Sequence, residues 1–407
     1  MTARDVSEAL ARARKAGEAL RARPADRVLD ALAAAVDRLA DPSSAIRSAL
    51  AGELPAATGF SAETVRAGLD RALGAWSGDA LRGLVEDELG LKAFLGQGPR
   101  AVGGFATTAT ILAGALPMPT LLDLLAPLLL RSPVLAKPSQ HDPITAERFR
   151  RDLTDADPEL GAALEIVAFP SDDEDCVAAL LEADCVLVTG SDATVAAVSA
   201  GVAAPRRVVA HGHKLSVAAV GPEAESDVAE RIARDVALWD QLGCLSPVAV
   251  YAVGGADPGP ALADALAQAE TRWPRGRVPA EAANAALAQA DQARMRGARV
   301  WANAAGRFTV VCESDTRWRM TPLHRFVRVH PVPDTASLVD ALRPLGPFLA
   351  GAALEGFGPA TRELALACAE LGASRICAPG RMQEPPLSWC RGNRGVLIPL
   401  ARLADLE

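Results

Sequence analysis

The sequence is poor in several residue types, and each shortage excludes a class of function. Only 4% of the 407 residues are aromatic, and Tyr251 is the single tyrosine. The formal net charge is −8 at pH 7. A general nucleic-acid-binding protein usually presents a basic patch and stacking aromatic rings, and both are in short supply here. We therefore expect no nucleic-acid partner.

Paired cysteines are also missing. The seven cysteines form no C-x-x-C pair, which argues against a zinc ribbon and against a thioredoxin-type motif. An odd number of scattered cysteines is typical of free thiols in a reducing compartment. The first 20 residues are charged and helical in pattern, without the apolar stretch of a signal peptide. These features predict a cytoplasmic protein.

Lysine is rare. Of 42 cationic residues, four are lysines (Lys15, Lys92, Lys137 and Lys214), which leaves 38 arginines. Such a bias replaces lysine with arginine wherever either residue serves. A lysine retained against the bias is therefore a candidate for a specific role.

One apolar stretch, residues 108–130, has the length of a membrane span but carries Asp123 near its middle and three prolines. A proline inside a helix removes a hydrogen bond, and a charge at mid-membrane depth is unfavourable. We therefore predict a buried strand, a turn and a buried helix here, and no integral membrane segment.

Beyond residue 134, short apolar runs alternate with helical patterns. This alternation predicts mostly parallel sheets covered by helices. The predicted fold class is α/β, with two doubly wound α/β domains, a helical N-terminal region and a small oligomerisation element. We place the helical region and a cofactor-binding domain in residues 1–220, a catalytic domain in 221–385 and an oligomerisation strand in 386–407.

Cys244 lies at the predicted domain junction, between a helix over 226–242 and a strand over 248–253. A nucleophilic cysteine needs partial exposure and donors that stabilise its thiolate, and a loop in an interdomain cleft provides both. Most free cysteines are simply small buried apolar residues. The local sequence alone leaves both interpretations open.

Three further segments follow predicted strands, where doubly wound sheets bind their ligands. Lys137-Pro138-Ser139 brings a cation within reach of a ribose or a phosphate. Gly190-Ser191 opens a helix, whose first backbone amides favour phosphate. His211-Gly212-His213-Lys214 joins two strands and lacks a third metal ligand nearby, so we expect a turn with one functional histidine and no metal site.

The order and spacing of these segments resemble the aldehyde dehydrogenase superfamily. That superfamily has an apolar strand ending in Lys-Pro-Ser, a Gly-Ser turn, a Glu-Leu-Gly-Gly-Lys segment and then the catalytic cysteine. Here the steps are 53 residues from Lys137 to Gly190, 21 from Gly190 to His211 and 33 from His211 to Cys244. Segments 241–247 and 379–389 are most similar to the acyl-CoA reductases of the bacterial luminescence type (LuxC-like).

This resemblance implies that an acyl-CoA, expected to be fatty, is reduced by NADPH to the aldehyde through an S-acyl intermediate on Cys244. Aldehyde-oxidising members carry a glutamate at the position of His211, and that glutamate activates the water that hydrolyses the enzyme thioester. A thioester reductase needs no hydrolysis. We expect His211 to assist proton transfer, because histidine titrates near neutral pH.

The resemblance also assigns the cofactor-binding residues, which are Lys137, Ser139, Gln140, Gly190, Ser191 and Gly212. NAD-preferring members often carry a glutamate at the position of Gln140, and a glutamate there would repel a 2′-phosphate. Glutamine removes that repulsion and Lys137 adds a positive charge. NADPH is therefore favoured over NADH.

Ala115 departs from the family pattern, which usually has at this position an asparagine that helps to form the oxyanion hole. Loss of one such donor lowers the rate by about 10²–10³. Two alternatives stay open: a cysteine acyltransferase or thioesterase that uses Cys244 and His211 without a nicotinamide, and a catalytically silent subunit of an oligomer, which would be consistent with Ala115. The apolar run over 395–400 predicts a strand, and the family implies a homodimer or higher homo-oligomer.

Overall fold

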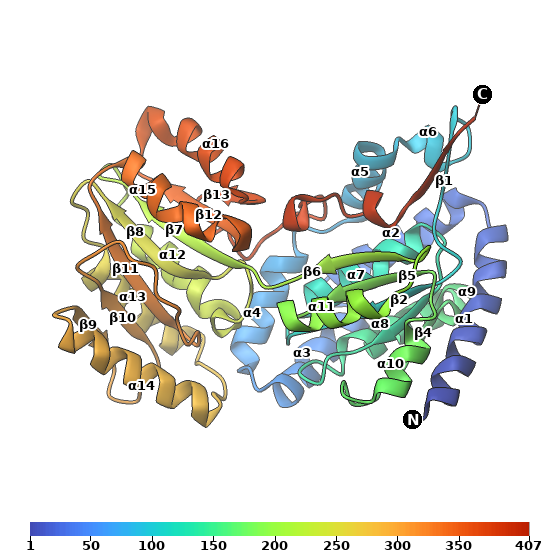
Figure 1. Ribbon diagram of the computed structural model, residues 1–407, viewed down its shortest axis with the longest axis horizontal. Coiled ribbons are helices and arrows are strands. Elements are labelled where there is room, and N and C mark those ends of the chain that lie inside the picture. The colour runs from blue at the N-terminus through green and yellow to red at the C-terminus, as the bar shows by residue number, and fades with distance from the viewer. Residues whose placement is uncertain (407) are drawn as a thin grey trace.

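The computed structural model describes residues 1–406 and contains two mainly parallel sheets, each with helices on both faces (Figure 1). This arrangement confirms the predicted α/β class with a helical N-terminal region. The first sheet has five parallel strands in the order β4-β3-β2-β5-β6. Its strands are β2 (Thr108–Ile111), β3 (Val134–Lys137), β4 (Leu164–Ile166), β5 (Cys185–Thr189) and β6 (Arg207–His211).

Alternating side chains of the first sheet pack on opposite faces, as strand geometry requires. On one face, Leu187 joins a cluster with helices α2, α7 and α8; on the other, Val186 joins a cluster with α1, α10 and α11. The helices of this half are α1 (Ala3–Ala22), α2 (Ala25–Ala40), α3 (Ala45–Thr58), α4 (Ala62–Leu73), α5 (Gly78–Leu89), α6 (Leu91–Phe94), α7 (Pro117–Leu129), α8 (Thr145–Ala156), α9 (Pro158–Ala162), α10 (Glu174–Leu180) and α11 (Asp192–Gly201).

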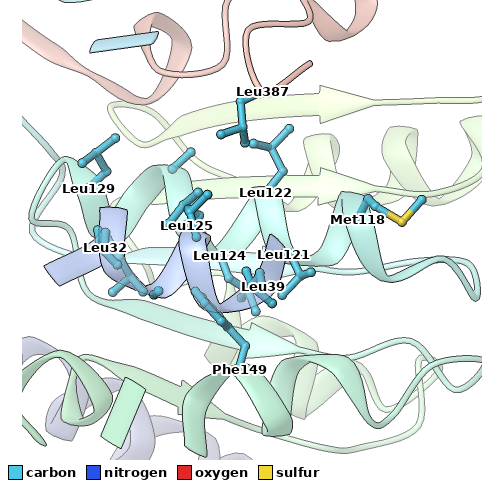
Figure 2. Packing of buried hydrophobic residues seen from close by; sticks show 14 of the residues in the cluster. Leu32, Leu39, Met118, Leu121, Leu122, Leu124, Leu125, Leu129, Phe149 and Leu387 are labelled. Atoms are coloured by element: carbon cyan, nitrogen blue, oxygen red, sulfur yellow. The ribbon is translucent and has the colours of Figure 1, made fainter. Parts of the chain in front are cut away.

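The apolar stretch 108–130 forms strand β2 and helix α7, as predicted. Proline is tolerated in the first turn of a helix, and Pro117 is the first residue of α7. Figure 2 shows the leucines of α7 packed against Leu32 and Leu39 of α2, with Leu387 of the C-terminal segment on the other side. Among residues 1–406, no helix is both long and apolar enough for a membrane crossing.

The second sheet has seven strands in the order β13-β12-β7-β8-β11-β10-β9, with β9 antiparallel to β10. Its strands are β7 (Leu215–Val220), β8 (Pro247–Val253), β9 (Arg299–Ala302), β10 (Thr309–Cys312), β11 (Phe326–Val332), β12 (Leu349–Glu355) and β13 (Arg375–Cys377). The covering helices are α12 (Val228–Ala237), α13 (Gly259–Arg272), α14 (Ala280–Met295), α15 (Thr335–Leu342) and α16 (Thr361–Leu371).

The predicted boundary after residue 220 is wrong, because β7 pairs with β8 and β12 in the second sheet. Only the residues 212–214 separate β6 from β7. Parallel neighbours need a long crossover connection. The turn therefore carries the chain from one sheet to the other, and the two units divide between His211 and Leu215.

The predicted strand over 395–400 is also wrong. This segment contains the 3-10 turn Ile398–Leu400, since Pro399 has no backbone N–H to pair in a sheet. The C-terminal strand is β14 (Arg402–Asp405), which pairs antiparallel with β1 (Arg100–Gly103) in a separate two-stranded ribbon. All four residues of β14 are exposed.

Candidate active site between the two sheets

Cys244 lies in the loop that enters β8, at the junction of the two sheets, and its side chain is half-buried. It lines a cavity whose volume, together with the adjoining open solvent, is about 560 Å³. The other walls are mostly apolar and come from the α4–α5 connection, the start of α7 and the C-terminal segment, including Trp76, Met118 and Trp389. The cavity lining within residues 1–406 includes no carboxylate.

The Cys244 loop begins where the predicted helix over 226–242 ends early. Helix α12 stops at Ala237, and Trp239, Asp240 and Gln241 have left-handed φ angles of 56°, 50° and 66°. This conformation is unfavourable by about 1–2 kcal/mol for each non-glycine residue. Trp239 is fully buried against α4, where a Cβ at Gly68 would lie 2.3 Å from its ring. The turn is therefore held by tertiary contacts.

A second left-handed trio, Leu323 to Arg325, supports the first. Arg325 is fully buried and donates to Asp240 Oδ1 from both Nε (3.1 Å) and Nη2 (2.7 Å). Gln241 donates from Nε2 to the carbonyls of Pro247 and Phe326, and its Oε1 accepts from the Phe326 N–H. These bonds tie the loop to β11 and fix the direction from which Cys244 enters the cavity.

The charge state of Cys244 depends on opposing effects. Burial raises the pKa of the Cys244 thiol, while the cations of Arg391 and Lys214 and the residue's own backbone N–H act in the opposite direction. Ser216 Oγ on β7 donates to the Cys244 carbonyl at 2.7 Å, which fixes the backbone of the loop. Because burial has the largest effect, the pKa of the thiol lies above its usual value, and the two cations reduce that shift.

His211 ends β6 and lines a neighbouring cavity of about 330 Å³, not the cavity of Cys244. Burial, aided by Arg391, Arg394 and Lys214, lowers the pKa of His211 to about 3. The near-neutral titration that we expected is therefore wrong: burial disfavours the imidazolium, and the ring is neutral at pH 7.

Arg391 separates the two cavities and belongs to both linings, a role that the sequence did not suggest. Its Nη1 donates to Asp123 Oδ1 at 2.9 Å and its Nη2 to Thr189 Oγ1 at 3.0 Å. Thr189 Oγ1 in turn donates to Asp123 Oδ2 at 2.9 Å. The one feature of the sequence that pointed to this ion pair was Asp123. It is the single charge of an apolar stretch, and a buried carboxylate requires a cationic partner.

The residues expected at the cofactor gather at the carboxyl edge of the first sheet. Lys137 ends β3; it is buried, donates from Nζ to Ser171 Oγ at 3.0 Å and lies over the Phe169 ring. Burial lowers the pKa of Lys137. Ser139 is buried and its Oγ accepts from the His141 N–H, whereas the Gln140 side chain is exposed.

Gly190 and Ser191 lead from β5 into α11, where Ser191 Oγ caps the helix by accepting from Thr194 N–H at 3.1 Å. Gly212 lies opposite, and a Cβ there would be 2.5 Å from Asp192 Oδ1, which accepts from the His213 N–H. The helix start fits a phosphate-bearing ligand, and Lys137 lies two strands away at the end of β3. The Asp192 carboxylate at this helix start opposes an anion.

A known family matches most of the chain. The sequence model of the family described as Acyl-CoA reductase (LuxC) matches residues 20–389. Among curated proteins, no sequence matches the chain.

Several solved structures share the fold over 99% of this chain. Methylmalonate-semialdehyde dehydrogenase from Oceanimonas doudoroffii is 16% identical, with a TM-score of 0.80 over 90% of that chain. A Sinorhizobium meliloti protein of the same type, complexed with NAD, is 16% identical with a TM-score of 0.77 over 89% of that chain. Betaine aldehyde dehydrogenase from Staphylococcus aureus is 15% identical, with a TM-score of 0.75 over 88% of that chain. These likenesses establish an aldehyde-dehydrogenase fold.

Proposed function

The chain belongs to the LuxC family of acyl-CoA reductases, and from this premise we propose that it reduces a fatty acyl-CoA to the aldehyde with NADPH, through an S-acyl intermediate on Cys244. Membership of the family makes the protein an oxidoreductase of the acyl-CoA reductase type. The acyl class, the cofactor and the intermediate are the proposal. The observation that carries it is the half-buried Cys244 at the junction of the sheets, facing a largely apolar cavity.

The proposed chemistry starts when Cys244 loses its proton and its thiolate attacks the thioester carbonyl carbon. The C–S bond to CoA breaks, and the CoA thiolate leaves and takes up a proton. When bound, NADPH supplies the hydride for reduction of the acyl group on Cys244. The resulting thiohemiacetal collapses: its C–S bond breaks, the aldehyde leaves and the Cys244 thiolate returns.

The surroundings of Cys244 favour reduction over hydrolysis. No carboxylate of the described chain lines its cavity, so nothing there acts as the base for a water molecule. His211 is neutral and lines the adjoining cavity. We keep His211 in the proposal as a neutral hydrogen-bonding residue near the junction, not as an imidazolium acid. These features also count against the acyltransferase or thioesterase alternative, which needs a Cys244–His211 pair.

For the cofactor, we propose that Lys137 and the start of α11 at Gly190 and Ser191 hold the phosphates, with Ser139, Gln140 and Gly212 completing the site. The support is the set of donors at the sheet edge, together with an exposed Gln140 that carries no negative charge. NADPH is the proposed cofactor because these groups tolerate a 2′-phosphate.

We also propose a cytoplasmic homodimer or higher oligomer. The support is the β1–β14 ribbon, whose exposed strand β14 offers an unpaired edge. Light scattering tests this part, and a monomer at micromolar concentration contradicts it.

Intact mass spectrometry tests the central proposal. Mixing the protein with a fatty acyl-CoA is expected to add the mass of one acyl group, which NADPH then removes with release of aldehyde. Cys244→Ala is expected to show neither change. Acylation that is not reversed by NADPH indicates acyl transfer, and a folded protein that is never acylated indicates a silent subunit.

A further inference from the structure

Asp123 is a buried charge that the proposed reaction does not use. It lies in α7 with 5% of its surface exposed, within the most apolar stretch of the sequence. Bringing a carboxylate and its partner out of water is unfavourable, and a buried ion pair is often less stabilising than apolar residues of the same volume. The burial of Asp123 therefore indicates that the cation paired with it has a functional role.

That cation is Arg391, and its hydrogen bonds leave much of it unused. The guanidinium has five N–H donors. Within residues 1–406, two of them bond to protein acceptors, Asp123 Oδ1 and Thr189 Oγ1. Arg391 lines the cavity of Cys244, where it is the single charged side chain. Its free donors are therefore available to a negative charge that forms there.

The backbone around Arg391 is built to hold this position. The segment 389–398 crosses between the sheets above the end of β6 (Figure 1). Trp389 Nε1 donates to Ser374 Oγ, and Asn393 Nδ2 donates to the Gly372 carbonyl on the second unit. On the other side, the Glu88 carboxylate of α5 accepts from the N–H groups of residues 396, 397 and 398. We call this anchored segment, residues 389–398, the strap.

We infer that Arg391 is the charge-stabilising residue of the Cys244 site, and that Asp123 and Thr189 are the residues that position it. The inference rests on the proposed function, since it assigns Arg391 to the thiolate and to the oxyanion that forms from the thioester carbonyl. It accounts for Ala115, which leaves the site without the neutral amide donor usual in the superfamily. A charge-assisted donor is about twice as strong as a neutral one.

The charges that face Cys244 support this assignment. Arg391 is the larger of two cationic influences that lower the pKa of the thiol, and Lys214 is the smaller. Lys214 is already engaged, since its Nζ donates to the Pro347 carbonyl at 2.7 Å. Burial is already the largest influence on the thiol, so removal of Arg391 should raise the pKa of Cys244 further.

Alkylation of Cys244 provides the test, because it reports the thiolate without substrate or cofactor. The rate with iodoacetamide is followed against pH by peptide mapping, which separates Cys244 from Cys390 beside Arg391. Arg391→Gln is expected to raise the apparent pKa of Cys244 by about 1, which slows alkylation about tenfold at pH 7. Anionic iodoacetate is expected to lose more rate than neutral iodoacetamide, because the attracting cation is gone.

Two further variants separate charge from scaffolding. Arg391→Lys keeps the cation and is expected to stay close to the parent profile, whereas Asp123→Asn frees the guanidinium and is expected to fall between the two. Arg394→Gln, an exposed position on the same strap, is the matched control and is expected to leave the profile unchanged. Thermal melting establishes that each variant is folded.

The inference is overturned if Arg391→Gln keeps the parent pH profile, or if Lys and Gln at position 391 shift it equally. A failure of the proposed function gives a different result. The parent protein is then not acylated by a fatty acyl-CoA, although its alkylation profile still depends on Arg391.

Discussion

The two connections at the junction of the sheets are built in opposite ways. The loop that carries Cys244 is reached through a buried left-handed turn, locked by the Arg325–Asp240 ion pair and three bonds of Gln241. The turn after His211 has three residues, and His213 within it is held by Asp192 at an exposed helix start. The side of the proposed nucleophile is thus fixed by buried contacts, and the side of the proposed cofactor site is exposed and polar. A covalent step needs the reacting atom held to within about 0.5 Å, whereas a dissociating cofactor needs an accessible edge.

Cys244→Ala is the strongest test of this contrast. Loss of the one nucleophile in the cavity is expected to abolish acylation and aldehyde formation, while binding of NADPH, followed by fluorescence, stays intact. Cys377→Ala is the matched control: this cysteine is also half-buried and lies in strand β13 of the second sheet, but outside the cavity lining. Residual turnover in Cys244→Ala would place the chemistry elsewhere.

Arg325→Met probes the rigidity of the nucleophile side. It leaves Asp240 buried without its partner, which is expected to lower the free energy of unfolding by about 3–5 kcal/mol. Urea denaturation measures the loss, and slower acylation at Cys244 is expected with it.

Arg307→Met is the control for this loss. Arg307 approaches the same Glu270 that Arg325 contacts, but from an exposed position at 3.7 Å. A loss below about 1 kcal/mol is expected there. Equal losses of unfolding free energy in Arg325→Met and Arg307→Met would show that the Cys244 loop is held no more strongly than an ordinary surface segment.

Gln140→Glu probes the open side. A carboxylate at this exposed position is expected to repel the 2′-phosphate and shift the ratio of kcat/KM for NADPH over NADH towards NADH by about tenfold, or about 1.4 kcal/mol. Stability should not change. Gln268→Glu, on an exposed position of α13, controls for the added charge. An unaltered ratio would mean that position 140 does not meet the cofactor's ribose.

The same contrast explains what the sequence could predict. Elements with a regular local pattern were placed within a few residues: the stretch 108–130 forms the predicted strand (β2) and helix (α7), and the strand predicted over 248–253 is β8. Cys244 was identified from its place between a helix and a strand. The left-handed turn before it was missed, because residues far along the chain, Gly68 and Arg325, impose it.

Contacts between residues far apart in the sequence could not be predicted either. Arg391 follows Asp123 by 268 residues, and no local pattern joins them, although the isolated charge of Asp123 marked an unusual position. The transfer of β7 to the second sheet was missed for the related reason that a short turn looks the same whether it connects neighbours or separate sheets. The pKa of His211 depends on burial and on three cations brought together only by folding.

His211→Gln is expected to have the smallest effect on catalysis, less than about tenfold in kcat, since a neutral hydrogen-bonding side chain replaces a neutral imidazole.

The effect of the same substitution on the pH dependence of stability is clearer. The pKa of His211 is lowered from its usual 6.5 to about 3, so between these values the unfolded chain binds a proton that the folded protein does not. The contribution to stability is complete above pH 6.5 and is lost as the pH falls towards 3. His211→Gln is therefore expected to melt with a shallower loss between pH 6.5 and pH 5 than the parent, and to match the parent's slope above pH 7. His141→Gln, an exposed position in the same unit, serves as the control and is expected to keep the parent's slope. An identical acid profile for His211→Gln would show that burial does not lower the pKa of the His211 ring.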